Sequence, residues 1–344
     1  MAIKVAINGF GRIGRAFFRL TQEHKEIHIV AVNDLGDVKN LAYLLAYDSV
    51  YGKNKAVISS NEGALVVNGK EVPFLSEKDP LKLPWKKLGV DVVLESTGVF
   101  ASYEKAKVHL DAGAKRVVIS APVEDTSPPG VNGATVLIGV NEEQFKTCDI
   151  SSNASCTTNA GSPLIAILHE AIGIEKALLN TVHGYTASQS LVDSPVRGSD
   201  YRRGRAAAHN IIPSTTGAAT AVTKAFTELD GLFDGIAMRV PVVAGSIADI
   251  TFLAKRDTTV EEVNDVLRAA AKTDRWKKVF AVTDEQLVSS DILGEPHASI
   301  ADLSFTRVVG GNLVKVLAWY DNELGYTNSL VEHVVATGRY ATAK

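Results

Sequence analysis

In the first half of the chain, short and almost continuously apolar runs alternate with stretches of helical spacing. The apolar runs predict strands at residues 3–7, 28–32, 91–96, 115–120 and 134–140. Strands that are apolar on both faces are typical of a parallel sheet covered by helices on both sides. The helical stretches between them, such as GRAFFRLTQEH and SYEKAKVHLDAGA, therefore predict a doubly wound α/β domain.

The pattern changes after about residue 152. Longer runs predict strands at 175–183, 235–243, 246–254 and 312–321, and a helix is predicted at 259–273. Strands in succession, with helices gathered elsewhere, favour an α+β domain. The stretch Gly184–Arg205 has no period, and a structureless segment of that length is usually functional or disordered. Residues 326–335 predict an amphipathic helix.

The composition and net charge of the chain argue against several classes of function. With 344 residues, of which 46% are hydrophobic, two domains with sizeable cores are expected. A net charge of −3 without blocks of like charge gives no support for binding nucleic acid or a membrane surface. Two cysteines make neither a disulfide framework nor a zinc site, so no metal is expected. The start of the chain lacks signal-peptide features and no run is long enough to cross a membrane, which favours a cytoplasmic protein.

A glycine-rich turn follows the first predicted strand. Gly9, Gly11 and Gly14 form G-x-G-x-x-G, which suits a tight turn, a close backbone approach to a pyrophosphate, and close packing of helix on strand. Asp34 ends the second strand, where a carboxylate can bind a ribose hydroxyl pair and repel the 2′-phosphate of NADP. This context predicts NAD binding, although Asp34 also suits a plain turn.

Cys156 stands in SSNASCTTN, a setting too polar for an ordinary core cysteine. A nucleophilic thiol needs help to lose its proton, from a helix N-terminus or a histidine. Ser162-Pro163 is a good start for the following helix, which leaves Cys156 in a turn. A helix that starts at Cys156 must instead tolerate Pro163. His183 ends a predicted strand and is the candidate base, though a satisfied strand-end histidine is the alternative.

Two further features suit phosphate. Thr216 and Gly217 precede an alanine-rich helix, where hydroxyl and N–H groups form an anion site or merely a helix cap. Arg239 interrupts an apolar strand, so it either pairs structurally or faces an anionic ligand. Most arginines of the 184–205 stretch, Arg197 among them, are expected to be solvated.

Taken together, these motifs resemble those of the phosphorylating glyceraldehyde-3-phosphate dehydrogenase family. The matching segments follow that family's order and cover residues 3 to about 328: INGFGRIGR, VNDL, YDSVYGK, SNASCTTN, TVHGYTASQ, RAAAHNIIPSTTGAA, RVP and WYDNELGYTN. The resemblance implies a Rossmann-type NAD-binding domain over residues 1–152 and a catalytic domain with a mixed sheet over 153–322. It further implies that residues 323–344 form a helix that packs back on the first domain, and that the protein is a homotetramer.

The resemblance also implies roles for individual residues. Cys156, at the start of a helix, matches the nucleophile and His183 the base. Cofactor contacts beyond the three glycines are matched by Arg12, Ile13, Asp34, Lys78, Ser120 and Asn322. The site for inorganic phosphate and bound substrate is matched by Ser155, Thr157, Arg203, Thr216 and Gly217. The substrate's own phosphate is matched by Thr186 and Arg239, and Gly184–Arg205 matches a loop that lines a neighbouring subunit's cofactor site.

The implied reaction converts glyceraldehyde 3-phosphate, phosphate and NAD to an acyl phosphate and NADH, through a hemithioacetal and a thioester on Cys156. Ala160 departs from the pattern because many members have a second cysteine there, and Ser188 stands where some have a different polar residue. Pro195 fits NAD use, whereas Ser194 and Gly36 leave room for NADP. Alternatives are an erythrose-4-phosphate dehydrogenase, which tends to lack the STTG pattern, a thiol hydrolase, and a non-catalytic dinucleotide-binding protein.

Overall fold

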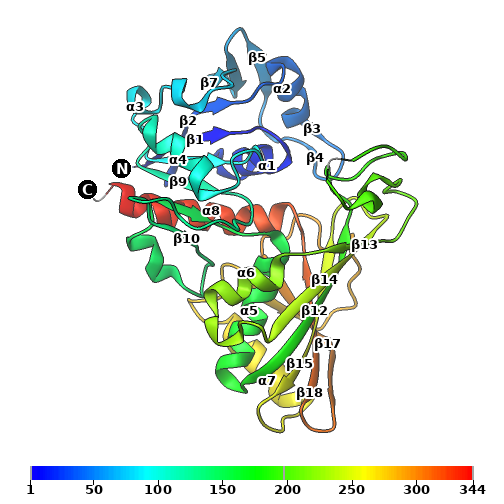
Figure 1. Ribbon diagram of the computed structural model, residues 1–344. Coiled ribbons are helices and arrows are strands. Elements are labelled where there is room, and N and C mark those ends of the chain that lie inside the picture. The colour runs from blue at the N-terminus through cyan, green and yellow to red at the C-terminus, as the bar shows by residue number, and fades with distance from the viewer. Residues whose placement is uncertain (1, 197, 343–344) are drawn as a thin grey trace. The chain divides into compact units, whose positions relative to one another are not determined.

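The computed structural model describes residues 2–196 and 198–342, so Arg197 lies outside the described residues. The chain forms two compact units (Figure 1). Unit 1 consists of Met1–Ala154 and Leu330–Lys344, and unit 2 of Ser155–Ser329. Among the described residues, no helix is both long and apolar enough to cross a membrane.

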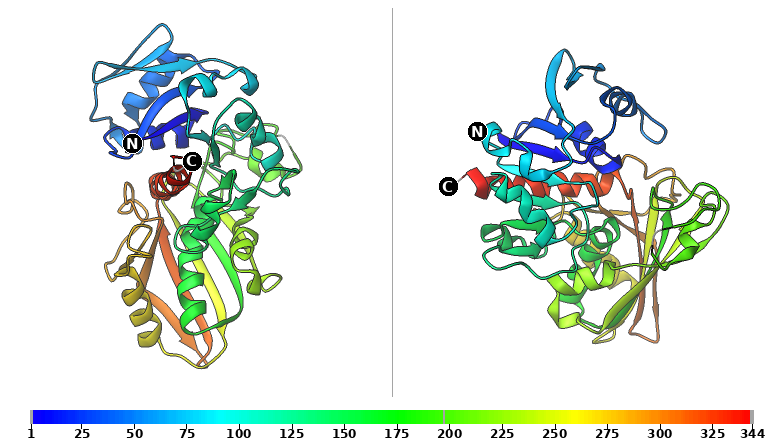
Figure 2. Two further views of the ribbon diagram at one scale, coloured as in Figure 1. Left: turned by 90° about the vertical axis from the view of Figure 1, so that its left-hand side faces the viewer. Right: turned by 45° about the horizontal axis from the view of Figure 1, so that its top comes forward.

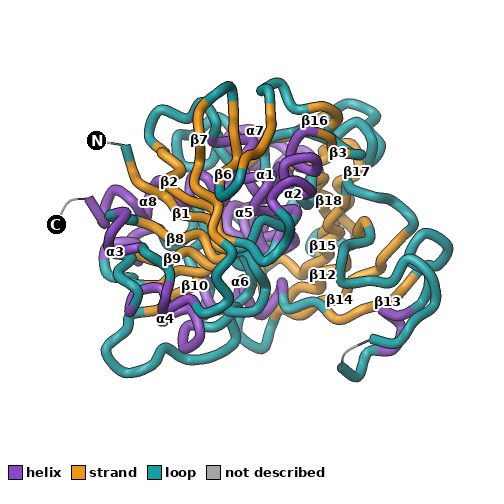
Figure 3. Tube along the Cα trace, turned by 90° about the horizontal axis from the view of Figure 1, so that it is seen from above, coloured by secondary structure: helices purple, strands orange, loops and turns teal. Residues whose placement is uncertain are grey.

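Unit 1 is built on a nine-stranded sheet with the order β10-β11-β9-β8-β1-β2-β7-β6-β5 (Figure 3). Pairing is parallel from β10 to β7 and antiparallel from β7 to β5. The strands are β1 (Ile3–Asn8), β2 (Ile27–Asn33), β5 (Ile58–Asn61), β6 (Ala64–Val67), β7 (Lys70–Leu75), β8 (Val92–Glu95), β9 (Arg116–Ile119), β10 (Gly133–Thr135) and β11 (Ile150–Ser152). The order β7-β2-β1-β8-β9-β11 is that of a doubly wound dinucleotide-binding fold, whose ligand crevice lies where the order reverses, between β1 and β8.

Helices connect these strands, and their ends follow local capping chemistry. The oxygens of Asp37 and Ser102 accept hydrogen bonds from Asn40 N and Lys105 N at the starts of α2 and α4. The helices are α1 (Arg12–Thr21), α2 (Val38–Ala46), α3 (Trp85–Leu88) and α4 (Tyr103–Asp111), with 3₁₀ turns η1 (Pro80–Lys82) and η2 (Glu142–Lys146). A separate two-stranded hairpin consists of β3 (Tyr47–Asp48) and β4 (Gly52–Lys53).

The prediction of a strand over residues 134–140 is wrong beyond Thr135. There the chain leaves the sheet and turns at Gly139, which has a φ of 80°. The N–H of Leu137 donates to Asn141 Oδ1 at 2.8 Å, and the N–H of Val140 donates to Leu137 O at 3.0 Å. Local side-chain and turn bonds thus replace the ladder that an apolar run suggests.

The last helix, α8 (Leu324–Thr342), is longer than the predicted 326–335. Within unit 1 its end lies beside the start of β1 (Figure 2): a Cβ on Gly338 would come within 2.5 Å of Ile3. Arg339 also pairs with Glu26 at 3.0 Å. Fully buried His333 bonds Ser151 Oγ through Nε2 at 2.7 Å and Asn153 Oδ1 through Nδ1 at 3.1 Å, which ties the helix to β11 and the turn after it.

Unit 2 is built on a seven-stranded mixed sheet with the order β13-β14-β12-β15-β18-β17-β16. Its strands are β12 (Ile174–Gly184), β13 (Ile212–Thr215), β14 (Phe233–Val240), β15 (Ser246–Ala254), β16 (Phe280–Thr283), β17 (Ser299–Val309) and β18 (Leu313–Tyr320). Its helices are α5 (Cys156–Ala171), α6 (Ala218–Ala225) and α7 (Val260–Ala271), with 3₁₀ turns η3 (Tyr201–Gly204) and η4 (Thr227–Leu229). β15 alternates strictly between buried and half-buried residues, because helices cover one face of the sheet (Figure 1).

We expect the His333→Gln variant to lose stability less steeply than the wild type as the solution is acidified. Burial lowers the pKa of His333 to about 3, so below the unfolded value of about 6.5 the unfolded chain binds a proton that the folded chain does not. Stability is therefore lost as the pH falls from about 6.5 towards 3, by at most about 1.4 kcal/mol per pH unit for this residue. Thermal unfolding at pH values on both sides of 6.5 measures the difference, and parallel curves for the two proteins would contradict it.

Candidate active site

The glycine-rich turn of unit 1 has no room for larger residues at two of its three glycines. Gly9 has a φ of 97°, and a Cβ there would lie 2.6 Å from the backbone of Ser96. A Cβ on Gly14 would lie 2.1 Å from Gly9 O, so α1 packs directly against the turn. Gly11 differs, since nothing lies within 4 Å of a Cβ built on it. The backbone at Gly11 is therefore open to a ligand.

The residues around this turn fit a dinucleotide. Gly11 is the N-cap of α1 without a side-chain cap, which leaves the N–H groups of the first turn, including those of Arg12 and Ile13, for an anion. Asp34 Oδ2 accepts from Phe10 N at 2.6 Å and Oδ1 from Gly36 N at 2.8 Å, so its carboxylate is held beside the turn. The geometry thus brings the three glycines and Asp34 together at the carboxyl ends of β1 and β2.

The other predicted cofactor residues are placed less tightly. The Arg12 guanidinium is 2.6 Å from Asp48, so its side chain already has a partner. Ser120 follows β9, and its N–H and Oγ both donate to Glu95 O, at 2.9 and 3.1 Å. Lys78 is exposed in the loop after β7. In unit 2, Asn322 Oδ1 accepts from Gly245 N and Ser246 Oγ at 3.0 Å each, which leaves its NH₂ group as a donor.

Cys156 is the first residue of α5, and the helix continues through Pro163. The alternative start at Ser162 is therefore wrong, and the start implied by the family resemblance is confirmed. Ser155 is the actual N-cap, and its Oγ accepts from Thr158 N at 3.0 Å. Ala154, directly before this cap, has a φ of 54°, an uncommon conformation for a residue with a side chain. Cys156 thus lies at the N-terminus of α5, directly after a turn with an uncommon backbone conformation.

The structure brings Cys156 and His183 into contact. The Cys156 Sγ lies 3.3 Å from Nε2 of His183, which sits near the end of β12 and is 2% exposed. Nδ1 of His183 lies 2.6 Å from Gly184 O. If Nδ1–H donates to this carbonyl, Nε2 carries the lone pair that faces the thiol, whereas Nδ1 as the acceptor of Arg239 Nη1, 2.7 Å away, puts the proton on Nε2. The first tautomer is the one that a base for Cys156 needs. This arrangement is the activated-thiol geometry expected of a cysteine nucleophile and its base.

Arg239 supplies the positive charge of this cluster. It is the register partner of His183 on the neighbouring strand β14, and its Nη1 lies 2.7 Å from His183 Nδ1 and 3.3 Å from Gly184 O. Burial and the Arg239 charge together lower the pKa of His183 to about 3, so the imidazole is neutral. Burial raises the pKa of the Cys156 thiol, and Arg239 opposes that rise. The resting pair is a protonated thiol beside a neutral base.

Tyr320, the last residue of β18, connects the elements that carry the pair. Its hydroxyl lies 2.9 Å from Thr157 Oγ1 on α5 and 2.7 Å from Thr181 Oγ1 on β12, and the ring contacts His183 edge-on at 5.9 Å between centroids. Burial raises its pKa, so the phenol stays protonated. Sequence reasoning missed this residue. Its only signal was its place inside the WYDNELGYTN segment.

The predicted phosphate residues lie in three parts of unit 2: the start of α5, the segment after β12, and η3 with the end of β13. Ser155 caps α5, whereas the Thr157 hydroxyl is buried and bonded to Tyr320. Thr186 follows β12 and bonds Ser188 Oγ at 2.9 Å. Only part of the predicted set is thus brought directly to the Cys156–His183 pair.

The remaining predicted residues lie along β13 and η3. Arg203 donates to Ser214 Oγ at 3.0 Å, and its charge lowers the pKa of Arg239, after the larger effect of burial. Thr216 accepts from Ala218 N at 3.2 Å, and Gly217 is the N-cap of α6 with open space around it. Arg203 is also 3.6 Å from Asp200, so its charge is partly neutralised, whereas no carboxylate is recorded beside Arg239 among the described residues. An arginine of this kind suits a phosphorylated ligand. Among the described residues, no cluster of His, Cys, Asp and Glu could hold a metal ion.

Known family models match both units of the chain. Residues 3–103 match the NAD binding domain of glyceraldehyde 3-phosphate dehydrogenase, and residues 155–322 match its C-terminal domain. The chain belongs to the glyceraldehyde 3-phosphate dehydrogenase family. The resemblance inferred from the motifs is therefore confirmed, as is the Rossmann-type fold of the first domain.

Curated relatives match over almost the whole chain. The glyceraldehyde-3-phosphate dehydrogenase of Thermotoga maritima is 51% identical over 332 residues, which are 96% of this chain and 97% of the relative. That of Streptomyces coelicolor is 47% identical over 98% of this chain and 99% of its own length. That of Geobacillus stearothermophilus is 47% identical over 96% of this chain and 97% of its own length. The family assignment thus covers both units.

We expect Tyr320→Phe to slow the alkylation of Cys156 by iodoacetamide about fivefold at neutral pH. Loss of the hydroxyl removes the two hydrogen bonds by which Tyr320 connects α5 to β12. If this costs about 1 kcal/mol of the free energy that holds Cys156 and His183 in place, the alkylation rate falls about fivefold. Mass spectrometry of the labelled protein gives the rate separately for each cysteine.

Buried Cys148, in unit 1, is the internal control for a general loosening of the fold. Thr181→Val removes one of the same hydrogen bonds, so the double variant should be slowed by less than the product of the two single effects. An unchanged Cys156 rate in Tyr320→Phe, or an equal change at Cys148, would show that Tyr320 does not position the pair.

Proposed function

We propose that the protein is an NAD-dependent, phosphorylating glyceraldehyde-3-phosphate dehydrogenase of glycolysis and gluconeogenesis. The observation that carries the proposal is the Cys156–His183 pair, with 3.3 Å between Sγ and Nε2 at the start of α5 and Arg239 beside it. A thiol hydrolase has no use for a dinucleotide cradle, and a non-catalytic binding protein has no use for this pair. The family of the chain supplies the substrate class.

The reaction begins with the attack of Cys156 on the aldehyde carbon. As Sγ bonds to that carbon, the thiol proton passes to Nε2 of His183 and then to the new oxygen, which gives a hemithioacetal. The N–H groups of Cys156 and Thr157, which lie beside the sulfur at the start of α5, are donors for the negative charge that develops on this oxygen. His183 is neutral again after this step and can act as a base.

NAD, when bound, supplies the hydride acceptor. While the hydride leaves the former aldehyde carbon, His183 takes the hydroxyl proton, and a thioester on Cys156 remains. Arg239 holds the substrate's phosphate in this proposal. An anion on Arg239 cancels the charge that helps to hold the pKa of His183 at about 3, so bound substrate makes His183 a stronger base.

Inorganic phosphate then attacks the thioester, so that a C–O bond forms and the C–S bond breaks. The proton of hydrogen phosphate returns to sulfur, and His183 loses its own proton to solvent. Ser155, Thr157, Arg203, Thr216 and Gly217 are proposed to hold the phosphate and bound substrate, together with Thr186 for the substrate's own phosphate. The open N-cap Gly217 and the partly exposed Arg203 support the phosphate role best.

The two units divide the work in this proposal. Residues 1–152 hold NAD through the glycine turn and Asp34, with Lys78 and Ser120 as further contacts. Residues 153–322 carry the chemistry and one further cofactor contact, Asn322. A free 2′-phosphate would meet the Asp34 carboxylate, which is held by two backbone N–H groups. The preference for NAD is therefore electrostatic, while Ser194 and Gly36 leave room for some use of NADP.

We further propose a homotetramer in the cytoplasm. Leu178 and Ile236, on neighbouring strands of the unit 2 sheet, are 66% and 50% exposed. In the loop after β12, Leu191 and Tyr201 are 79% and 78% exposed, which suits a segment that lines a neighbouring subunit. The absence of a membrane-spanning helix among the described residues is compatible with this placement and adds no more than that.

The first experiment measures reduced nicotinamide with glyceraldehyde 3-phosphate and NAD, with phosphate present or omitted. We expect phosphate-dependent turnover, its abolition in Cys156→Ser, and a decrease in kcat of about 10²–10⁴-fold in His183→Asn, because general base catalysis contributes about that much. Turnover with erythrose 4-phosphate alone would move the substrate to the alternative enzyme. Silence with every aldehyde would refute an enzymatic role.

Asp34→Asn should reduce the selectivity for NAD over NADP. The change removes the negative charge but keeps the size of the side chain, so we expect the ratio of kcat/KM for the two cofactors to fall at least about tenfold, equivalent to about 1.4 kcal/mol. Asp37→Asn is the matched control, because Asp37 only caps α2. A ratio that is unchanged in Asp34→Asn, or changed equally in both variants, would exclude Asp34 as the discriminator.

A further inference from the structure

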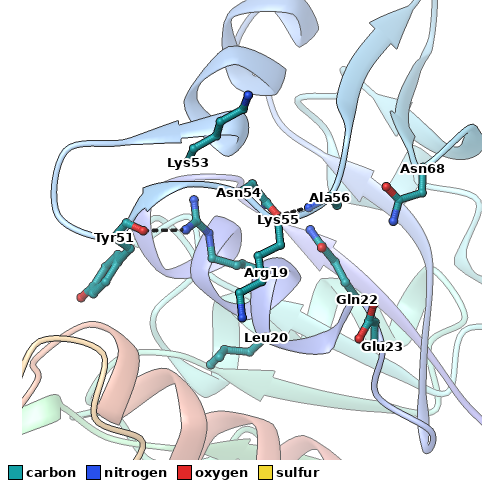
Figure 4. Close-up of a pocket in the computed structure, with 10 residues that line it drawn as sticks. All are labelled: Arg19, Leu20, Gln22, Glu23, Tyr51, Lys53, Asn54, Lys55, Ala56 and Asn68. Carbon is teal, nitrogen blue, oxygen red and sulfur yellow. Dashed lines mark hydrogen bonds between the residues drawn. The ribbon is translucent and has the colours of Figure 1, made fainter.

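A second pocket of unit 1 is not used by the proposed reaction. It has a volume of about 360 Å³ and lies between the end of α1, the β3–β4 hairpin with the segment after it, and the turn before β7 (Figure 4). Its lining residues are Arg19, Leu20, Gln22, Glu23, Tyr51, Lys53, Asn54, Lys55, Ala56 and Asn68. This volume is within the range of small-molecule sites.

The charges around this pocket are mostly positive. Arg19, Lys53 and Lys55 line it, and the one lining carboxylate is that of exposed Glu23. The carboxylate of Asp48, which is paired with Arg12, lies outside the lining but opposes the fall in the pKa of Arg19 that burial causes. Within the part of the chain that the structure describes, none of the three cations forms an ion pair, although most other arginines of unit 1 have a carboxylate partner. Arg19 donates to three carbonyls, those of Leu45 in α2 and of Tyr51 and Gly52 in the hairpin, at 3.3–3.4 Å.

The amide side chains of Gln22 and Asn68 add N–H donors for which the structure records no acceptor. The Gln22 Nε2 atom is fully buried and has no hydrogen-bond partner. The Asn68 Oδ1 atom accepts from Val57 N at 2.9 Å, so its Nδ2 is the end left for a ligand. Asn54 differs, since its carboxamide is occupied by Leu45 O and Ala56 N. Figure 4 shows Arg19, Lys55 and Gln22 next to one another, with Asn68 beyond Gln22.

We propose that this pocket binds a small anion with two phosphate groups or a comparable double negative charge. Ligand oxygens accept hydrogen bonds from the Gln22 and Asn68 amides, and the charge is neutralised by Arg19 and Lys55, with Lys53 at the edge. Charge-assisted hydrogen bonds between a cation and a phosphate are stronger than hydrogen bonds between neutral groups. None of its lining residues belongs to the glycine turn or to unit 2, so the proposal does not depend on the proposed reaction.

Inorganic pyrophosphate is the probe, and lysine acetylation is the readout. The full-length protein is treated with an acetylating N-hydroxysuccinimide ester, with pyrophosphate or with potassium chloride of equal ionic strength, and each lysine is quantified by mass spectrometry. We expect pyrophosphate to slow the acetylation of Lys55 at least about fivefold, which corresponds to four-fifths occupancy. Lys105, exposed on α4, is the control residue and should be unaffected.

Two variants test whether the pocket itself is responsible. Gln22→Met keeps the length of the side chain but removes the buried donor, and we expect it to weaken the protection of Lys55. Glu23→Gln removes the one carboxylate and should strengthen it, while Glu104→Gln on α4, the control for a change in net charge, should not. Three outcomes would overturn the proposal and leave an adventitious ion only. Chloride could slow the acetylation of Lys55 as much as pyrophosphate does, pyrophosphate could slow the acetylation of Lys105 equally, or the protection of Lys55 could be unchanged in Gln22→Met.

Discussion

The buried polar first turn of α5 is the constraint on which the active site depends. Thr157, Thr158 and Asn159 are at most 5% exposed, and buried polar groups must be paired to avoid a large cost. Thr157 bonds Tyr320, Thr158 bonds Ser155, and Asn159 bonds Ser329. Their partners come from the N-cap, from the end of β18 and from α8. The position of Cys156 is therefore set by the surrounding fold of unit 2 rather than by the helix alone.

Elements with a strong period and clear ends could be predicted from the sequence. β15 lies at the predicted residues 246–254, and α7 falls within the predicted 259–273, because each has one buried face. The apolar run at 134–140 could not be resolved, since an apolar run in a sheet and one in a buried turn look alike. β17 escaped prediction, and its side chains do not alternate between buried and exposed, since its first five residues are all buried.

In the candidate site, features that depend on neighbouring residues could be predicted, and features that depend on residues far apart in the sequence could not. The glycine turn could be predicted because its residues are neighbours in sequence and each has a steric reason. The start of α5 could not be decided, since Ser155 and Ser162 are both good caps and only tertiary packing makes Pro163 acceptable within the helix. Tyr320 lies 163 and 139 residues from its two threonine partners, so no local pattern indicated that bond.

The same packing explains how a nucleophile can be kept unreactive until it is needed. Burial holds the proton on Cys156 and keeps His183 neutral, so little thiolate is present to react with oxidants. Ala160, one helical turn further on, packs against Cys156, so an inert methyl group adjoins the thiol there. Arg239 favours the thiolate and opposes the imidazolium at the same time. An anion that pairs with Arg239 would cancel the second effect and so raise the pKa of His183.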